Sequence, residues 1–449
     1  MKEIHIECAG AGKTYGIAQK IKEILADCPD CMKIHAITHT NYAVRQIKEE
    51  LIKTMYSIPD NVEVATVHSF LLRNIIYPYS GYTKGEIINS CSVEELPENY
   101  KLQAKRKREL KDIGVVHTSD VRQYARSVLI ASSADKVAVK NKKEIAVGYF
   151  ISDIYCLFVD EAQDMDDWFF ELMLIIIYRI EHFYFVGDPF QALWTTDKYR
   201  SFTENVADQE GMVINTNFVS RRIPACIVPL CNKILPEGFK LSSINNKEGV
   251  VAYTLLSDLD NKTIRALSSN SVFSYIKSKT NVFSTASDDK RLPDDFLQVF
   301  AKKYQSYDID ALCHVALHKI HELGLDAFLG KTKIDLPESL YDKLANRFNK
   351  GDETGVFVEA IPKIKGLESD TAFFIICNSL LEILLGVKNE FNKETNYLYV
   401  ALTRAKHRLL FIIDDDEGLK KNFRKLKIDI DTAMVELGIP RVVIEEWFE

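Results

Sequence analysis

A glycine-rich loop near the N-terminus carries residue types that bind phosphate. The segment from Glu7 to Thr14 reads ECAGAGKT, follows the apolar run EIHI, and matches G-x-x-x-x-G-K-[ST] except where Glu7 replaces glycine. In a loop that joins a strand to a helix, backbone N–H groups point at phosphate. Lys13 is expected at the β and γ phosphates and Thr14 at Mg²⁺, while the Glu7 carboxylate must turn away to avoid repelling phosphate. The residues expected to cradle the phosphates are Cys8, Ala9, Gly10, Ala11, Gly12, Lys13 and Thr14.

Two carboxylates and a glutamine follow apolar runs further along the chain. Asp160 and Glu161 end the run CLFV, and Gln191 lies in GDPFQALW after the run HFYFV. Of two adjacent carboxylates, one can bind a metal ion while the other acts as a general base. We expect Asp160 to hold the Mg²⁺ shell, Glu161 to accept the proton of the attacking water, and Gln191 to sense the γ-phosphate. The predicted chemistry is ATP hydrolysis with Mg²⁺ as cofactor.

The elements that must position these residues are predicted by alternating strand and helix patterns. The apolar runs KIHAIT, VEVATV, IYCLFV and HFYFV each end in polar residues, and helical periodicity appears in GIAQKIKEIL and AVRQIKEELIKTM. Such runs are typical of buried parallel strands, whose carboxyl ends collect ligands at one edge of the sheet. A second block, with strands GVFVEAI, TAFFII and RLLFII, begins near residue 216. The sequence therefore predicts an α/β fold with two parallel sheets.

Two segments interrupt this alternation. Residues 76–149 are rich in lysine and arginine, including KLQAKRKRELK at 101–111, and predict a helical insertion. Their charge run is either a solvated helix face or a contact to nucleic acid. Residues 250–350 interrupt the second block.

Composition narrows the class of protein. A chain of 449 residues can form two to four domains, and its net charge of -7 argues against nucleic-acid binding over the whole surface but permits a local basic groove. No apolar run has the length of a membrane span and no secretory signal is present, so we expect a cytoplasmic protein with no membrane partner. The nine cysteines are expected to be reduced, and Cys28 and Cys31 to lie in a turn rather than a zinc or redox site.

The motifs together resemble those of the UvrD/Rep family of superfamily-one DNA helicases. Besides the loop, the segments similar to family motifs are THTNYAV (38–44), TVHSFLLR (66–73), DEAQD (160–164), GDPFQALW (187–194), KGLESD (365–370) and YVALTRA (399–405). The resemblance implies two RecA-like P-loop NTPase domains with helical insertions, and ATP-driven 3′ to 5′ movement on DNA. It implies a first RecA-like domain (1–75 and 150–215), a helical insertion (76–149), a second RecA-like domain (216–250 and 350–449) and a reduced accessory insertion (251–349).

The fourth motif of the family contains an arginine that must be chosen here between two neighbours. In NFVSRRIPACIVPLCN only Arg222 stands five residues before an isoleucine and ten before an asparagine, which is the family spacing. The resemblance then implies that Arg222 and Arg404 approach the γ-phosphate from the second block and neutralise charge in the transition state. It places Glu368 at the ribose.

The resemblance also implies single-stranded or tailed DNA as the partner. The residues expected to line its groove are Thr38, His39, Asn41, His68 and Trp194. A histidine and a tryptophan can both stack on bases without reading sequence. For Trp194, a place in the protein core is the alternative.

The base of the nucleotide is expected to be held by its face. The family reads adenine with an upstream glutamine, and the chain before the loop, from Met1, has no room for that segment. The family also clamps adenine between an arginine after the loop and a tyrosine before the motif-four arginine. Here Tyr15 and Arg221 occupy those positions in exchanged order. An aromatic face and a guanidinium plane can still form a clamp, so base selectivity is expected to be weak.

Several departures from the family lead to two functional hypotheses. Ala360, Pro362 and Ser369 replace the threonine, histidine and aromatic of the fifth motif, the accessory region is short, and no nuclease motif follows. In this the chain resembles the compact helicase subunit of the Gabija antiphage system, which works beside an OLD-family nuclease. Our leading hypothesis is a DNA translocase or helicase that acts with a partner such as a nuclease in DNA processing or antiphage defence. The alternative is a nucleotide- and DNA-sensing regulatory ATPase that switches a partner nuclease without processive unwinding.

Overall fold

The computed structural model separates the chain into two compact units. It describes residues 1–97, 99–193, 198–269, 272–278, 280, 282–285, 292, 294–304, 315–316, 319–320, 323–348, 356–388 and 391–448. The first unit contains residues 1–250, 365–370 and 382–408, and the second contains residues 251–364, 371–381 and 409–449.

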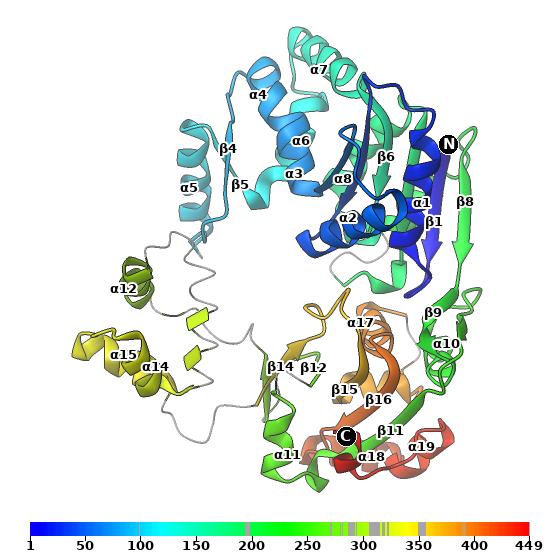
Figure 1. Ribbon diagram of the computed structural model, residues 1–449, viewed down its shortest axis with the longest axis vertical. Coiled ribbons are helices and arrows are strands. Elements are labelled where there is room, and N and C mark those ends of the chain that lie inside the picture. Colours follow the sequence, from blue (N-terminus) through cyan, green and yellow to red (C-terminus); the bar gives the residue numbers. More distant parts are fainter. Residues whose placement is uncertain are drawn as a thin grey trace. The chain divides into compact units, whose positions relative to one another are not determined.

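The first unit is built on a six-stranded parallel sheet (Figure 1). Its strands, in spatial order, are β3 (Val62–Thr66), β2 (Lys33–Thr38), β6 (Ile154–Val159), β7 (His182–Gly187), β1 (Lys2–Glu7) and β8 (Val213–Asn217). The register pairs Thr38 with Thr66, Val159 with Phe185, and Ile6 with Gly187. The carboxyl ends of these strands therefore meet at one edge, as the sequence predicts.

Helices cover both faces of this sheet because the side chains of its strands alternate between two cores. Ile34, Phe158 and Tyr184 pack with residues of α1 and α2 on one face, while Ile37, Leu157 and Phe183 pack with helices that include α6 and α8 on the other. The helices of this unit are α1 (Lys13–Leu25), α2 (Asn41–Met55), α3 (Val67–Leu71), α4 (Tyr77–Lys84), α5 (Tyr100–Asp112), α6 (Val121–Leu129), α7 (Val137–Ile151), α8 (Asp167–Ile177), α9 (Lys198–Val206), α10 (Val228–Ile234) and α17 (Lys393–Leu402).

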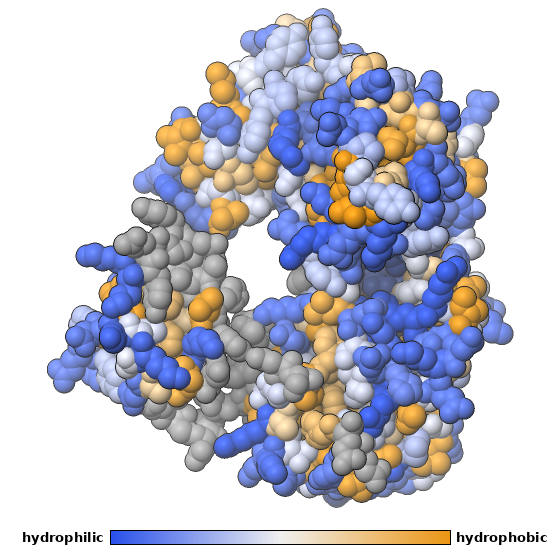
Figure 2. Space-filling view, in the orientation of Figure 1, coloured by the Kyte–Doolittle hydropathy of each residue, from blue (hydrophilic) through white to orange (hydrophobic). Residues whose placement is uncertain are grey.

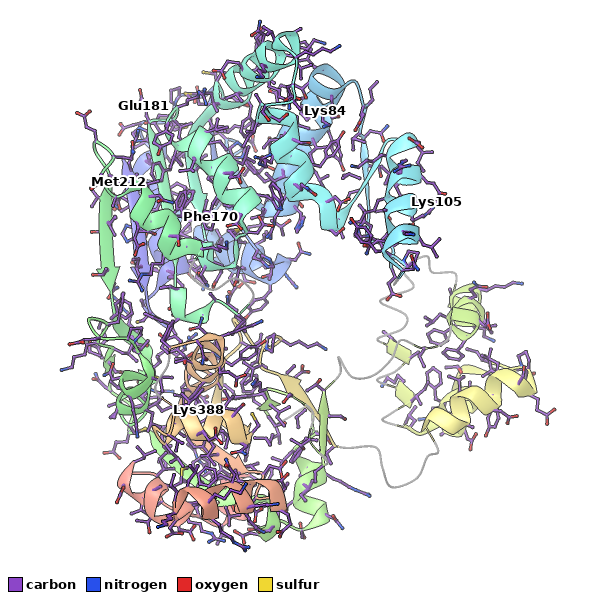
Figure 3. All side chains as sticks on the ribbon, turned by 180° about the vertical axis from the view of Figure 1, so that it is seen from behind. Lys84, Lys105, Phe170, Glu181, Met212 and Lys388 are labelled. Atoms are coloured by element: carbon purple, nitrogen blue, oxygen red, sulfur yellow. The ribbon has the colours of Figure 1, made fainter. Side chains whose placement is uncertain are left out.

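The basic stretch predicted as a helical insertion forms α5 beside a small two-stranded sheet of β4 (Ser90–Ser92) and β5 (Val115–His117). Only Leu110 of α5 is buried, and Lys105 extends from its outer face (Figure 3). Apolar side chains such as Ile87 and Ile113 are also exposed here, and Figure 2 shows hydrophobic residues among hydrophilic ones on this insertion. A second small parallel sheet joins β9 (Val219–Pro224) to β10 (Ser242–Asn245).

A second six-stranded sheet forms the core of the second unit. Its order is β11 (Val250–Leu255), β16 (Ala405–Ile413), β15 (Ser369–Ile376), β12 (Ser274–Ile276), β14 (Val356–Ala360) and β13 (Phe283–Thr285), and every pairing for which the structure gives a register is parallel. The accompanying helices are α11 (Asn261–Ala266), α12 (Asp294–Tyr304), α14 (Leu325–Thr332), α15 (Glu338–Phe348), α16 (Asn378–Leu384), α18 (Glu417–Leu426) and α19 (Ile430–Glu436). The predicted α/β fold with two parallel sheets is confirmed.

No helix among the described residues is both long and apolar enough to span a membrane. The eight cysteines that the structure describes are free thiols, and Cys28 and Cys31 lie between α1 and β2, as predicted.

Candidate nucleotide-binding site

The glycine-rich loop leaves β1 and enters α1 through two glycines in the left-handed backbone region. Gly10 has φ +75° and Gly12 has φ +101°, a conformation that L residues with a side chain rarely adopt. Helix α1 begins directly afterwards at Lys13, so its free N–H groups adjoin the loop. Lys13 donates a hydrogen bond from Nζ to the Cys8 carbonyl, 3.3 Å away. The loop has the conformation and the cation expected of a phosphate cradle.

Strand β9 holds this loop from the side. The Arg221 N–H donates to the Gly10 carbonyl at 2.9 Å, and the Ser220 hydroxyl donates to the Ala9 carbonyl at 2.8 Å. A Cβ atom on Gly10 would lie 2.6 Å from Cβ of Arg222, so the contact leaves no space for a side chain. The Ala9 N–H donates to the hydroxyl of Tyr399, 3.3 Å away on α17. The loop is thus fixed by two segments distant in sequence.

The carboxylates Asp160 and Glu161 lie where β6 ends. Asp160 is almost fully buried, and its Oδ1 accepts the Glu161 N–H at 2.9 Å. Burial and the Glu161 charge raise the pKa of Asp160, which the nearby Lys13 ammonium only partly offsets. Burial also opposes the charge on Glu161, but Lys365 and Lys13 outweigh it and hold the pKa of Glu161 below its usual value. The pair therefore differs in its affinity for protons, as two carboxylates with different roles require.

Glu161 is also held in place by an uncommon backbone conformation. Its φ of +52° lies in the left-handed region although it is not a glycine. Gln163 donates from Nε2 to the Glu161 carboxylate and accepts the Asp188 N–H at Oε1, 2.9 Å away. A Cβ on Gly187 would lie 2.6 Å from that Oε1. The ends of β6 and β7 are thus joined through one amide side chain.

Gln191 and Arg404 belong to the same polar cluster. Gln191 donates from Nε2 to Oδ2 of Asp188 at 2.7 Å, and its Oε1 lies 3.5 Å from Nη2 of the fully buried Arg404. Arg404 also donates to the carbonyls of Val400 and Leu367. These bonds orient the guanidinium toward the residue expected to sense the γ-phosphate.

Arg222 and Glu368 are brought together as an ion pair. Nη1 of Arg222 lies 3.0 Å from Oε2 of Glu368, whose other oxygen lies 2.7 Å from Nζ of Lys406. Nε of Arg222 is buried without a hydrogen-bond partner. A buried N–H of this kind fits an anionic ligand, because an unmet charged donor is costly.

The residues present fit a magnesium ion beside the phosphates. Mg²⁺ prefers oxygen ligands and is commonly bound by one or two carboxylates together with substrate phosphates. Asp160 supplies a buried carboxylate directly after β6, and Thr14 supplies a hydroxyl on the first turn of α1. No group of three or more metal-binding side chains occurs among the described residues, so an ion here would share its coordination with phosphate and water.

Sequence reasoning missed Lys365 and Asp164. Nζ of Lys365 lies 2.5 Å from Oδ1 of Asp164 and 3.9 Å from Oε2 of Glu161. Both residues lie inside quoted motifs, DEAQD and KGLESD, and the charge pairing between these motifs is the signal that could have found them. Lys365 is the cation that balances the acidic cluster beside the expected catalytic base.

The residues expected to contact DNA follow the ends of β2 and β3. Thr38 is fully buried and its hydroxyl has no hydrogen-bond partner, while Asn41 begins α2. Burial and then the Arg122 charge lower the pKa of His39 to about 4 and that of His68 to about 4. Both imidazoles are therefore neutral at neutral pH and suited to stacking or neutral hydrogen bonds. Trp194 lies outside the described residues.

The two residues expected to clamp the base are both accessible. Tyr15, on the first turn of α1, is 53% exposed, and the side chain of Arg221 is exposed on β9. The backbone of Arg221 touches the loop through its bond to Gly10. Both side chains are free to receive a ligand.

Comparison with known proteins supports a nucleotide-binding role for the first unit. Residues 4–196 match the model of a family described as AAA domain (AAA_19). This segment is thus similar to that family, and it contains the glycine-rich loop, Asp160, Glu161 and Gln191. No curated protein matches the sequence.

Among solved structures, one similar chain is titled "The structure of PRRSV helicase". The alignment has 10% sequence identity and a TM-score of 0.37, and it covers 94% of this chain and 54% of that chain. The chain thus spans about half the length of that structure.

We predict that Gly10→Ala weakens nucleotide binding by roughly tenfold or more, because it adds a left-handed strain and a clash with Arg222. The measurement is the Kd of a fluorescent ADP analogue. Gly16→Ala in α1 is the matched control, since its Cβ would meet only the Tyr184 hydroxyl at an ordinary 3.6 Å. Equal affinity of both variants would contradict the steric role assigned to Gly10.

Proposed function

We propose that this protein is an ATP-dependent DNA translocase or helicase that moves 3′ to 5′ and acts with a protein partner such as a nuclease. The proposal is carried by one observation: the loop, Glu161, Gln191 and Arg404 all belong to one compact unit and are tied together by hydrogen bonds and charge. The match of residues 4–196 to an AAA domain supports nucleotide binding by this unit. We also propose that residues 1–75 and 150–215 form one RecA-like domain, with 76–149 as a helical insertion. Residues 216–250 and 350–449 form the second, with 251–349 as a reduced accessory insertion.

The arrangement supports a separate role for each of these residues in ATP hydrolysis. Lys13 and the loop N–H groups bind the phosphates, and Glu161, kept anionic by Lys365 and Lys13, accepts the proton of the attacking water. Arg404 and Arg222 neutralise negative charge that develops on the γ-phosphate. When bound, Mg²⁺ would be held by Thr14 and Asp160 and would neutralise phosphate charge.

The proposed DNA contacts lie next to this machinery. Among the groups that shift the pKa of His39 are Lys365 and Glu161, so this residue lies within electrostatic reach of the expected catalytic base. DNA bound against Thr38, His39, Asn41 and His68 could therefore influence hydrolysis directly. This proximity supports coupling between DNA binding and the ATPase cycle.

A regulatory ATPase is the second candidate. The altered fifth motif, with Ala360, Pro362 and Ser369, favours it because these positions lack the side chains expected to contact DNA. In this reading the ATPase cycle senses DNA ends or nucleotide and switches a partner nuclease without processive unwinding. Purification from the native host without any nuclease would count against such a partner.

One experiment separates the two functions. We expect single-stranded DNA to stimulate ATP hydrolysis and a 3′-tailed duplex to be unwound, with both measured on the full chain. A 5′-tailed duplex is the control for polarity. Stimulation without strand displacement would favour the regulatory ATPase. Hydrolysis that ignores DNA would contradict the translocase and would leave only a switch that senses nucleotide.

We expect Glu161→Gln to retain ATP binding but to lower hydrolysis by roughly 100- to 10,000-fold, the usual contribution of a general base. Lys13→Ala should lose both binding and hydrolysis because the phosphates lose their cation. Nucleotide affinity and turnover are measured on the same preparations. Normal hydrolysis by Glu161→Gln would show that another group takes the proton.

We expect GTP to compete well with ATP, because Tyr15 and Arg221 would hold the base by its face, worth about 0.5–2 kcal/mol, rather than read its edge. The measurement is inhibition of ATP hydrolysis by GTP. Tyr15→Ala should weaken both nucleotides similarly. Strict selectivity for ATP would rule out this clamp as the main base contact.

A further inference from the structure

The phosphate loop begins with a carboxylate, Glu7, whose negative charge is expected to weaken phosphate binding. Glu7 replaces the first glycine of the phosphate-loop pattern and is almost fully buried directly before the cradle. Its negative charge contributes to raising the pKa of both Cys8 and Asp160, so its field reaches the phosphate and magnesium positions. An uncompensated Glu7 would therefore repel the nucleotide.

His5 faces this carboxylate from the same side of β1. Alternate residues of a strand share a face, so Glu3, His5 and Glu7 form one row. Nδ1 of His5 lies 3.3 Å from Oε1 of Glu7, and Nε2 lies 2.8 Å from Oε2 of Glu3. A neutral imidazole can donate from only one nitrogen, whereas the imidazolium donates from both. Two carboxylates at the two ring nitrogens thus fit the charged form.

Three neighbouring elements also contact this row. From β8, Nδ2 of Asn215 lies 3.3 Å from Nε2 of His5, and because an amide nitrogen only donates, this contact opposes the charged ring. From β7, the ring of Tyr184 lies 4.4 Å from the imidazole. From α1, Nζ of Lys20 lies 3.4 Å from Oε1 of Glu3. Burial opposes protonation of His5, but its bonds to Glu7 and Glu3 outweigh burial and raise its pKa above the usual value.

Charge counting shows what the protonation of His5 changes. Lys20 is shared between Glu3 and the more exposed Glu23, at 3.4 and 3.7 Å, so within the row on β1 it is the proton on His5 that offsets the charge of Glu7. Loss of that proton adds one net negative charge beside the phosphate loop. Because the pKa of His5 is raised, the charged imidazole is present at low pH and is lost as pH rises through that pKa.

We propose that His5 is a positioning residue of the nucleotide site, which turns the Glu7 carboxylate away from the phosphates and cancels its charge, so that nucleotide affinity follows the charge on His5. The proposal rests on the proposed nucleotide binding and deepens it. It explains how a phosphate loop with a carboxylate at its first position can function. It also makes affinity fall as pH rises.

The test compares the full chain with Glu7→Gln, using the Kd of a fluorescent ADP analogue with Mg²⁺ from pH 5.5 to 8.5. The phosphate of the probe titrates in this range, so the readout is the ratio of wild-type Kd to variant Kd at each pH. We expect a ratio near one at low pH that rises to roughly three- to tenfold at high pH, the effect of one nearby partly buried charge. A ratio that does not vary with pH would overturn the proposal.

His5→Gln provides the complementary arm. It should bind the probe more weakly than wild type at pH 6, and the double variant His5→Gln/Glu7→Gln should recover the lost affinity, which demonstrates coupling between the two residues. Glu3→Gln removes one of the carboxylates that favour the charged imidazole, so it should shift the pH profile to lower pH without abolishing it. Thermal unfolding of each variant checks that the fold is intact.

The outcomes separate this inference from the function on which it rests. If wild type binds the probe and Lys13→Ala does not, but His5→Gln binds like wild type at pH 6, the nucleotide site stands and the role of His5 is refuted. If neither wild type nor Glu7→Gln binds at any pH, the nucleotide site itself is refuted.

Discussion

The glycine-rich loop depends on backbone contacts made by segments that lie far away in sequence. Two left-handed glycines give the loop its shape, and three hydrogen bonds hold it: Arg221 N–H and the Ser220 hydroxyl donate to loop carbonyls, and the Tyr399 hydroxyl accepts the Ala9 N–H. Such preorganisation strengthens binding, because a loop that becomes ordered only when phosphate binds loses part of the binding free energy to the cost of ordering. The first unit is therefore arranged around the loop, with β9 and α17 as its supports.

Charge balance is the second constraint on the site. Burial of Asp160, Asp164 and Asp188 beside the partly exposed Glu161 would be unfavourable without nearby cations and donors. Lys13 and Lys365 supply the cations, and the side chains of Gln163 and Gln191 supply donors. The negative charge of the carboxylates is thus offset by neighbouring cations and hydrogen-bond donors, which also fix the side-chain positions.

The features that could be predicted from the sequence depend on residues close together in the chain. Apolar runs such as IYCLFV predicted buried parallel strands, and the residues that follow them, Asp160 among them, do lie at a common edge. The pairing of Lys365 with Asp164, and of His5 with Glu7, was not predicted. Such contacts depend on three-dimensional register and side-chain direction, for which spacing in one sequence gives no measure.

The amide bridge through Gln163 ties the identity of Gly187 to the placement of Glu161. Any residue larger than glycine at the end of β7 would meet the Gln163 oxygen at 2.6 Å and push on the side chain that holds the carboxylate. The geometry of a proton acceptor is thus limited by the absence of a methyl group on a neighbouring strand. The position of Glu161 therefore depends on how closely the backbone of β7 packs against Gln163, and a larger residue at position 187 would require a change at Gln163 as well.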